Sequence, residues 1–151
     1  MLRLSKKADY GLMAMKHLAE HADLGSCSAK DLADAYRIPS ELLAKILQRL
    51  VKAGLLQSQH GINGGYTLAR DAHEISAFEV IRAIDGPLFI TSCVTVRGDC
   101  DQTDLCTIRE PLRKVNQGIE DVLRSITIAA MREEPHVHGG VKKLAELVTL
   151  A

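Results

Sequence analysis

Three of the four cysteines in this 151-residue chain fall close together, and their side chains are well suited to metal chemistry. Cys93, Cys100 and Cys106 follow the spacing Cys-x6-Cys-x5-Cys, whereas Cys27 stands far upstream. In a chain that we expect to be cytoplasmic, such thiols favour metal or redox chemistry over a disulfide framework. Thiolates suit an iron-sulfur cluster or zinc, and the Cys-x2-Cys pair typical of structural zinc sites is absent from the sequence. The spacing favours a cluster over zinc or three reduced thiols.

Three cysteines leave one ligand position of a cluster to be filled from elsewhere. The sequence offers Asp9, Cys27, a histidine or an exogenous small molecule. A non-thiolate ligand would leave one iron more open to attack, which suits a sensor better than an electron carrier. On the residues alone, however, Asp9 is more simply explained as a favourable carboxylate in the first turn of a helix. Cys27 is more simply a small buried residue that precedes a helix.

The cysteine segment has to be positioned by helices on either side of it. Apolar residues recurring at spacings of three and four predict helices over residues 6–22, 28–36, 39–53 and 76–85. Capping boxes at Ser28 with Asp31 and at Ser76 with Glu79 mark two of the helix starts. Residues 90–106 then form a predicted loop that holds the three cysteines.

A third capping box, Thr107 with Glu110, predicts a long helix that runs to about Met131. Its apolar residues alternate at spacings of four and three, as in a coiled-coil seam: Ile108, Leu112, Val115, Ile119, Val122, Ile126 and Ala129. So narrow a seam usually needs a partner helix, and we therefore expect a homodimer. The alternative is that the seam packs on the first helix of the same chain. Residues 132–151 form the predicted tail; its part from Arg132 to Gly140 is polar and is expected to be mobile, and His136 and His138 in it are a weak metal signal.

The helices over 28–36 and 39–53 have the outline of a helix-turn-helix, with Pro39 at the first position of the second helix. The polar face of this second helix carries Ser40, Glu41, Ala44, Lys45, Gln48, Arg49 and Lys52. Short or hydrogen-bonding side chains at the helix start could approach base edges, while the cations further along could meet phosphates. The alternative is an ordinary solvated helix face.

Two short strands are expected next, over residues 55–59 and 66–68. The segment between them, His60-Gly61-Ile62-Asn63-Gly64-Gly65, is rich in turn-forming residues. A hairpin after a helix-turn-helix makes a winged helix, so His60, Gly61, Asn63 and Gly64 are candidate DNA contacts. The alternative is an ordinary tight hairpin.

The composition agrees with the prediction of a mainly helical DNA-binding protein. The chain holds 19 basic and 19 acidic side chains, but residues 1–70 carry a net charge of +4 and residues 71–151 a net charge of −4. Five aromatic residues and no Trp favour a mainly α fold with an aliphatic core. We expect a winged-helix DNA-binding domain (1–86), a cysteine-rich cluster-binding loop (87–106), a dimerisation helix (107–131) and a tail (132–151). The sequence shows neither a membrane-spanning run nor a set of catalytic groups typical of an enzyme.

These features together resemble the winged-helix iron-sulfur regulators that include IscR, NsrR and the regulator of the SUF cluster-assembly operon. The resemblance spans residues 1–131 and rests on residues 4–10, 61–66 and 84–87 and on the three-cysteine loop, with the SUF-operon regulators closest in appearance. It implies a homodimeric transcription regulator whose DNA affinity changes with its cluster. It also implies that Cys93, Cys100 and Cys106 bind a cluster of two or four irons.

Two positions depart from the pattern of IscR-like members. A histidine three residues after the last cysteine completes their site, but that position here is Arg109. In the nitric-oxide-sensing relatives, an aspartate in the first helix of the opposite subunit is the fourth ligand, and Asp9 occupies the matching place. The resemblance therefore implies Asp9 as fourth ligand. His60 stands where members often carry arginine, which predicts DNA binding that is more dependent on pH.

The leading hypothesis is a repressor of iron-sulfur cluster assembly genes that binds a palindromic site in double-stranded DNA under the control of its cluster. A second hypothesis keeps the winged-helix regulator but replaces the cluster with zinc or with thiol oxidation. A third is a small cluster carrier protein, for which the helix-turn-helix pattern would be incidental.

Overall fold

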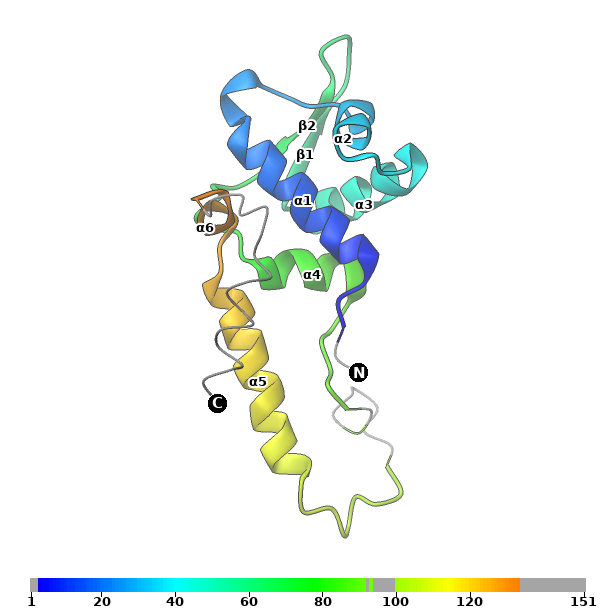
Figure 1. Cartoon of the computed structure of the whole chain (residues 1–151), viewed down its shortest axis with the longest axis vertical. Coiled ribbons are helices and arrows are strands. Elements are labelled where there is room, and N and C mark those ends of the chain that lie inside the picture. The colour runs from blue at the N-terminus through cyan, green and yellow to red at the C-terminus, as the bar shows by residue number, and fades with distance from the viewer. Residues whose placement is uncertain (1–2, 92, 94–99, 134–151) are drawn as a thin grey trace, which may run out of the picture.

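The computed structural model describes residues 3–91, 93 and 100–133 (Figure 1). The elements in chain order are α1 (Lys6–Glu20), the 3-10 helix η1 (Ala22–Leu24), α2 (Ala29–Tyr36), α3 (Ser40–Lys52), β1 (Leu56–Gln59), β2 (Gly65–Leu68), α4 (Ala77–Asp85), α5 (Arg109–Ser125) and α6 (Ile128–Glu133). The predicted class, a mainly helical winged helix with a small hairpin, is confirmed. Among the described helices, none combines the length and apolar character that crossing a lipid bilayer requires.

The core forms where α1 crosses α3 and α4, and α6 closes one end of α1 (Figure 1). Its largest fully buried side chains come mainly from these helices: Met15, Leu32, Leu43, Ile46, Leu47, Leu50, Leu55, Ile75, Val80 and Ile128. At the crossing of α1 with α4, Gly11 leaves room for the Ile84 side chain, because a Cβ atom at residue 11 would collide with Cδ1 of Ile84 unless that side chain moved. None of the largest fully buried side chains is aromatic, as the scarcity of aromatic residues predicted.

The helix starts only partly follow the predicted capping boxes. At α4, Ser76 and Glu79 form both reciprocal bonds, with the Ser76 amide donating to the Glu79 carboxylate over 3.0 Å. At α2, the Ser28 hydroxyl accepts from the Asp31 amide, but the Asp31 carboxylate accepts from that hydroxyl rather than from the Ser28 amide. α1 ends at Glu20, two residues before the predicted end, and η1 follows it.

The prediction for the long helix was wrong at both ends. α5 begins at Arg109 without a side-chain cap, and the predicted cap partner Glu110 instead bonds Arg113. α5 ends at Ser125, and the backbone of the next residue, Ile126, is extended. The Ile126 carbonyl accepts a hydrogen bond from the Ala77 amide over 2.8 Å. Pairing with the chain before α4 thus outweighs continuation of the helix, and α6 turns back onto α1.

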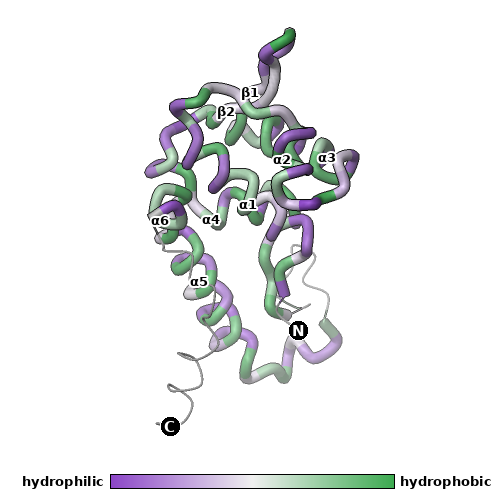
Figure 2. Tube along the Cα trace, turned by 45° about the horizontal axis from the view of Figure 1, so that its top comes forward, coloured by the Kyte–Doolittle hydropathy of each residue, from purple (hydrophilic) through white to green (hydrophobic). Residues whose placement is uncertain are grey.

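The break divides the predicted seam into a buried and an exposed part. Ala129 is buried in the core, whereas Ile108, Val115 and Val122 are 59%, 52% and 59% exposed. α5 extends away from the other helices in Figure 1, and Figure 2 shows hydrophobic positions recurring along it. The alternative that the whole seam packs on the first helix is wrong, because only its C-terminal end lies on an element packed against α1.

Candidate nucleic-acid interface and cysteine segment

Helix α3 presents the predicted polar face to solvent. Its apolar side is buried through Leu43, Ile46, Leu47 and Leu50. Most of the polar-face residues are exposed, and Ala44 is half-buried: the exposed ones are Ser40, Glu41, Lys45, Gln48, Arg49 and Lys52. Pro39 is the N-cap of α3 rather than its first residue, so the helix begins one residue later than predicted.

Arg49 differs from the other residues of this face in its hydrogen bonding. Its Nη1 donates to the carbonyl oxygen of Ile84 over 2.8 Å, which joins α3 to the last turn of α4. The structure therefore gives Arg49 a partner inside the protein, whereas Lys45 and Lys52 extend from an exposed face.

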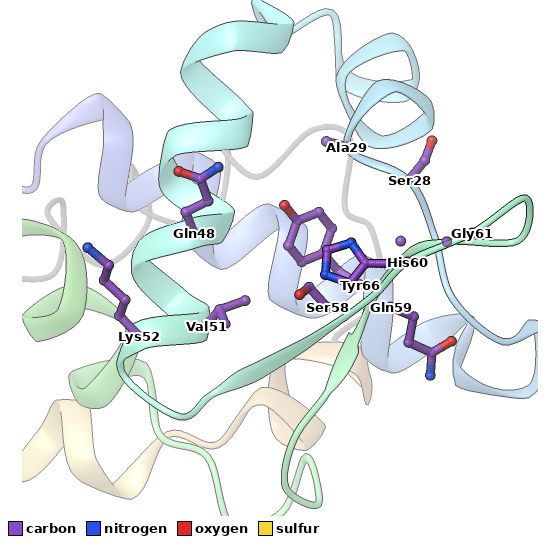
Figure 3. A pocket seen from close by; sticks show the side chains of 12 residues that line it. Ser28, Ala29, Gln48, Val51, Lys52, Ser58, Gln59, His60, Gly61 and Tyr66 are labelled. Atoms are coloured by element: carbon purple, nitrogen blue, oxygen red, sulfur yellow. The ribbon is translucent and has the colours of Figure 1, made fainter.

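A groove lies between α3 and the hairpin, and it brings together residues from both predicted DNA-binding segments. It has a volume of about 570 Å³, and Gln48 and Lys52 of α3 line it opposite His60, Gly61 and Gly64 (Figure 3). When a recognition helix enters the major groove, a wing beside it meets the neighbouring sugar-phosphate backbone. The groove thus brings Lys52 and Gln48 of α3 next to the turn of the hairpin.

The hairpin has the antiparallel register Leu56↔Leu68 through Gln59↔Gly65, within one residue of the predicted strands. Gly61 has a φ of +112°, and a Cβ atom on Gly64 would lie 2.6 Å from the Gln59 carbonyl oxygen. Asn63 faces a second cavity, where its carbonyl accepts from the Ser26 hydroxyl over 2.6 Å. The turn therefore favours glycine at residue 61 because of its positive φ, and at residue 64 because backbone lies too close for a Cβ atom.

Ile62 was missed as a candidate contact in the sequence analysis. It lies at the hairpin tip, which projects from the molecule in Figure 2, and its side chain is fully exposed. The sequence did carry a signal: Ile62 is an apolar residue between Gly61 and Asn63 in a predicted turn, where the protein core cannot bury it.

Cys27 braces the base of the hairpin through its backbone. Its amide donates to the Tyr66 carbonyl over 3.1 Å, and the Tyr66 amide donates to the Cys27 carbonyl over 2.8 Å. The thiol is half-buried, and burial first and the nearby Asp31 second raise its pKa. A raised pKa disfavours the free thiolate, so Cys27 is less reactive than an exposed cysteine.

The other three cysteines lie on the connection from α4 to α5, at the end of the molecule away from the hairpin (Figure 1). Cys93, Cys100 and Cys106 are half-buried free thiols, and Thr91 Oγ1 lies 3.3 Å from Cys93 Sγ. In the described part of the chain, no three His, Cys, Asp or Glu side chains converge as a metal site. The donor chemistry fits a cluster, and binding one would require the connection to draw the thiols together.

Asp9 lies in the first turn of α1, where the sequence places it. Its side chain is 45% exposed, and Oδ2 lies 3.7 Å from Nζ of Lys6. Within this chain it joins no described metal-ligand group, and Arg109 is the first residue of α5. His136 and His138 lie outside the described residues, as does the rest of the predicted tail from residue 134 onward.

Asn116 is a residue near the cysteines that the sequence analysis missed. It is only 6% exposed, its Oδ1 accepts from the Ile90 amide over 3.0 Å, and its Nδ2 donates to Glu120 over 3.2 Å. α5 thereby holds the chain three residues before Cys93. No signal in the sequence distinguishes Asn116 from the neighbouring amide Gln117, which is exposed.

Comparison with known proteins places these features in a family. Residues 4–134 match the Rrf2 family, described as iron-dependent transcriptional regulators. The chain is 31% identical over 136 residues to the HTH-type transcriptional regulator IscR of Vibrio campbellii, covering 90% of this chain and 80% of that protein. It is 33% identical over 130 residues to IscR of Serratia proteamaculans, covering 86% and 79%.

Solved structures of similar proteins share the fold. IscR of T. potens is 32% identical, with a TM-score of 0.65 over 99% of this chain and 93% of that one. CymR, the global cysteine regulator of B. subtilis, is 30% identical, with a TM-score of 0.71 over 87% and 97%. The family match covers most of the described winged helix and α5, and the named relatives are regulators rather than enzymes. This chain therefore belongs to the Rrf2 family of iron-dependent transcriptional regulators.

Proposed function

We propose that the chain acts in the cytoplasm as a homodimeric, DNA-binding repressor of cluster assembly genes, controlled by an iron-sulfur cluster. The observation that carries the proposal is the set of three free, half-buried thiols on the single connection between the winged helix and α5. Cys93, Cys100 and Cys106 would hold a cluster of two or four irons, and the cluster would supply the chemistry that responds to the signal. Asp9 of the second copy would fill the fourth position.

DNA binding is assigned to α3 and the hairpin. Ser40, Glu41 and Ala44, in the first turns of α3, would approach base edges. Lys45 and Lys52 supply cations for phosphates, and Gln48 shares with Lys52 the groove that faces the hairpin. His60, Gly61, Asn63 and Gly64 form the part of the hairpin that would meet the neighbouring backbone.

The homodimer is assigned to α5. Val115 and Val122 of α5 and its N-cap residue Ile108 are more than half exposed at seam spacing, and a second α5 would cover them. A two-fold dimer presents two copies of α3, and such dimers read palindromic half-sites in double-stranded DNA.

The cluster can be tested directly on protein purified without oxygen. We expect a brown protein with visible absorption and with about two or four irons and sulfides per chain. Cys93→Ala and Cys106→Ala should remove the colour, whereas Cys27→Ala, the matched control, should keep it. A colourless wild-type protein after anaerobic reconstitution, with zinc or without metal, would contradict the cluster.

The fourth ligand and DNA control need separate measurements. Asp9→Ala should change the absorption spectrum, whereas Lys6→Ala, which removes only the ion-pair partner of Asp9, should leave it unchanged. Promoter DNA of cluster assembly genes should bind the cluster-loaded and apo forms with different affinities at one salt concentration. Equal affinities of the two forms would exclude control by the cluster.

A further inference from the structure

The C-terminal turn of α4 connects three parts of the molecule that the proposed function requires to communicate. It precedes the cysteine segment, residues 90–106, and it packs on α1. It also accepts a hydrogen bond from Arg49 of α3. We infer that Arg49 is a positioning residue, which couples the cysteine segment to α3 through the carbonyl group of Ile84. This inference rests on the proposed function and replaces the predicted role of Arg49 as a phosphate contact.

The bond from Arg49 meets a group that the helix itself leaves unpaired. α4 ends at Asp85, so the Ile84 carbonyl has no amide four residues later within the helix. The Nη1 atom of Arg49 donates to this carbonyl over 2.8 Å. A cation is also favoured at the C-terminal end of a helix by the helix dipole. Both effects hold the guanidinium toward α4 rather than toward a ligand in solution.

The same turn of α4 is fixed to the start of α1. The amide of Ser5, the N-cap of α1, donates to Oδ2 of Asp85 over 3.1 Å, and the Ser5 hydroxyl donates to Oδ1. The side chain of Ile84 packs where α1 has Gly11 and therefore no Cβ. Ile84 and Asp85 thus touch α1 at two places and α3 at a third.

On its other side this turn leads directly into the cysteine segment. Gly86 has a φ of +82° and Pro87 follows, so the chain leaves α4 in a restricted direction. It is next held at Ile90, whose amide donates to buried Asn116 of α5. Drawing Cys93 toward the other two thiols would pull on the Ile90 anchor and, through it, on the short stretch from Gly86 to Ile90. A displaced Ile84 carbonyl would then shift Arg49 and, with it, α3.

The test compares DNA affinity in two states of the full-length protein rather than affinity alone. We would measure the ratio between the cluster-loaded and apo affinities for wild type, Arg49→Gln and Arg49→Lys. The ratio should fall about fivefold or more in Arg49→Gln, since allosteric couplings commonly lie at or above that size. Arg49→Lys keeps the charge but loses the planar donor group, and it should also reduce the ratio.

Two controls separate coupling from loss of charge. Lys52→Gln removes a proposed phosphate contact and should weaken both states by the same factor. Arg82→Gln removes an exposed arginine of α4 outside the DNA face and should change neither affinity nor ratio. Equal weakening of both states in Arg49→Gln would overturn the inference and return Arg49 to the phosphate contacts.

Amide hydrogen exchange of the apo protein gives a readout that needs no cluster. Arg49→Gln should raise exchange in residues 40–52 and in residues 84–90 together, whereas Arg82→Gln should change neither segment. Exchange that rises in only one segment, or in neither, would contradict the inference. A wild-type protein with equal affinities in its two states would instead refute the proposed function itself. A circular dichroism spectrum like that of wild type confirms that each variant is folded.

Discussion

The backbones of Cys27 and Tyr66 pair through two hydrogen bonds of 3.1 and 2.8 Å, and this pairing joins the hairpin to the residue just before the N-cap of α2. Because α2 packs against α3, the pairing fixes the hairpin relative to the proposed recognition helix. The width of the groove between α3 and the hairpin therefore depends on a short bridge outside the hairpin itself.

Gly65→Ala should break this bridge. A Cβ atom at residue 65 would lie 2.5 Å from the Cys27 carbonyl oxygen, and backbone cannot move aside as a flexible side chain can. We expect a loss of about 1–3 kcal/mol in the free energy of unfolding, as for other overpacked sites. DNA affinity should fall as well, because the hairpin would no longer be held beside α3. Urea denaturation and a DNA titration at constant salt measure the two effects.

Gly118→Ala is the matched control for this substitution. Gly118 lies within α5, and a Cβ atom there would meet no other atom within 4 Å. Alanine in an open helical position should stabilise the protein by about 0.5–1 kcal/mol. Equal stability of the two variants would show that the Cys27 carbonyl does not constrain residue 65.

Local signals in the sequence predicted the elements that local bonds determine. The Ser76 and Glu79 capping box predicted the start of α4, and the apolar spacing predicted the buried face of α3. The end of α5 could not be predicted in this way. Residues 107–131 keep a helical pattern throughout, but the Ile126 carbonyl accepts from the amide of Ala77, the first residue of α4 and a partner far away in sequence.

In the candidate site, too, residue types and spacing could be interpreted from the sequence, whereas partners distant in sequence could not be predicted. The types and spacing of Cys93, Cys100 and Cys106 predicted metal or redox chemistry, which stays a prediction. The internal partner of Arg49 could not be predicted, because an arginine on a polar helix face reads as a phosphate contact until its neighbour Ile84 is known. Asn116 likewise gained its role only from the position of the Ile90 amide.

Lysine at the exposed seam positions should dissociate the dimer without unfolding the chain. Val115 and Val122 are 52% and 59% exposed in one copy, so Val115→Lys with Val122→Lys costs little within that copy. In a dimer the four charges would be buried close together, which is strongly unfavourable. We expect sedimentation at the mass of one chain. Gln117→Lys, on the same helix but outside the seam, should remain dimeric, and a dimeric double variant would exclude this interface.

Removing the Asn116 amide should loosen the start of the cysteine segment. Asn116→Leu leaves the half-buried Ile90 amide without its acceptor, at a cost of about 1 kcal/mol in unfolding free energy. If Cys93 binds a cluster, the variant should also lose visible absorbance faster on exposure to air. Gln117→Leu removes an exposed amide that bonds Asp121 and should change both quantities little. Equal bleaching rates for the two variants would show that the Ile90 anchor does not protect the site.

Stability should fall in mild acid because of the contact between α1 and α2. Nδ1 of His17 lies 2.9 Å from the Tyr36 hydroxyl, and the His17 ring stacks on His21 with centroids 4.1 Å apart. Burial first and the charge of His21 second lower the pKa of His17, while Glu20 acts in the opposite direction. The folded chain therefore binds a proton at His17 less readily than the unfolded chain does.

The sign of the effect follows from this lowered pKa. Above a pH of about 6.5, the ordinary value for histidine, both folded and unfolded chains hold neutral His17 and its contribution is fully present. As the pH falls from there toward the lowered pKa of the folded state, the unfolded chain takes up the proton first and stability is lost. Urea midpoints at fixed protein concentration should decrease between pH 7.5 and 5.5 in the wild type. His17→Gln, which can still accept from Tyr36, should flatten this dependence, whereas His60→Gln at an exposed position should retain it. An unchanged slope in His17→Gln would assign the pH dependence to another group.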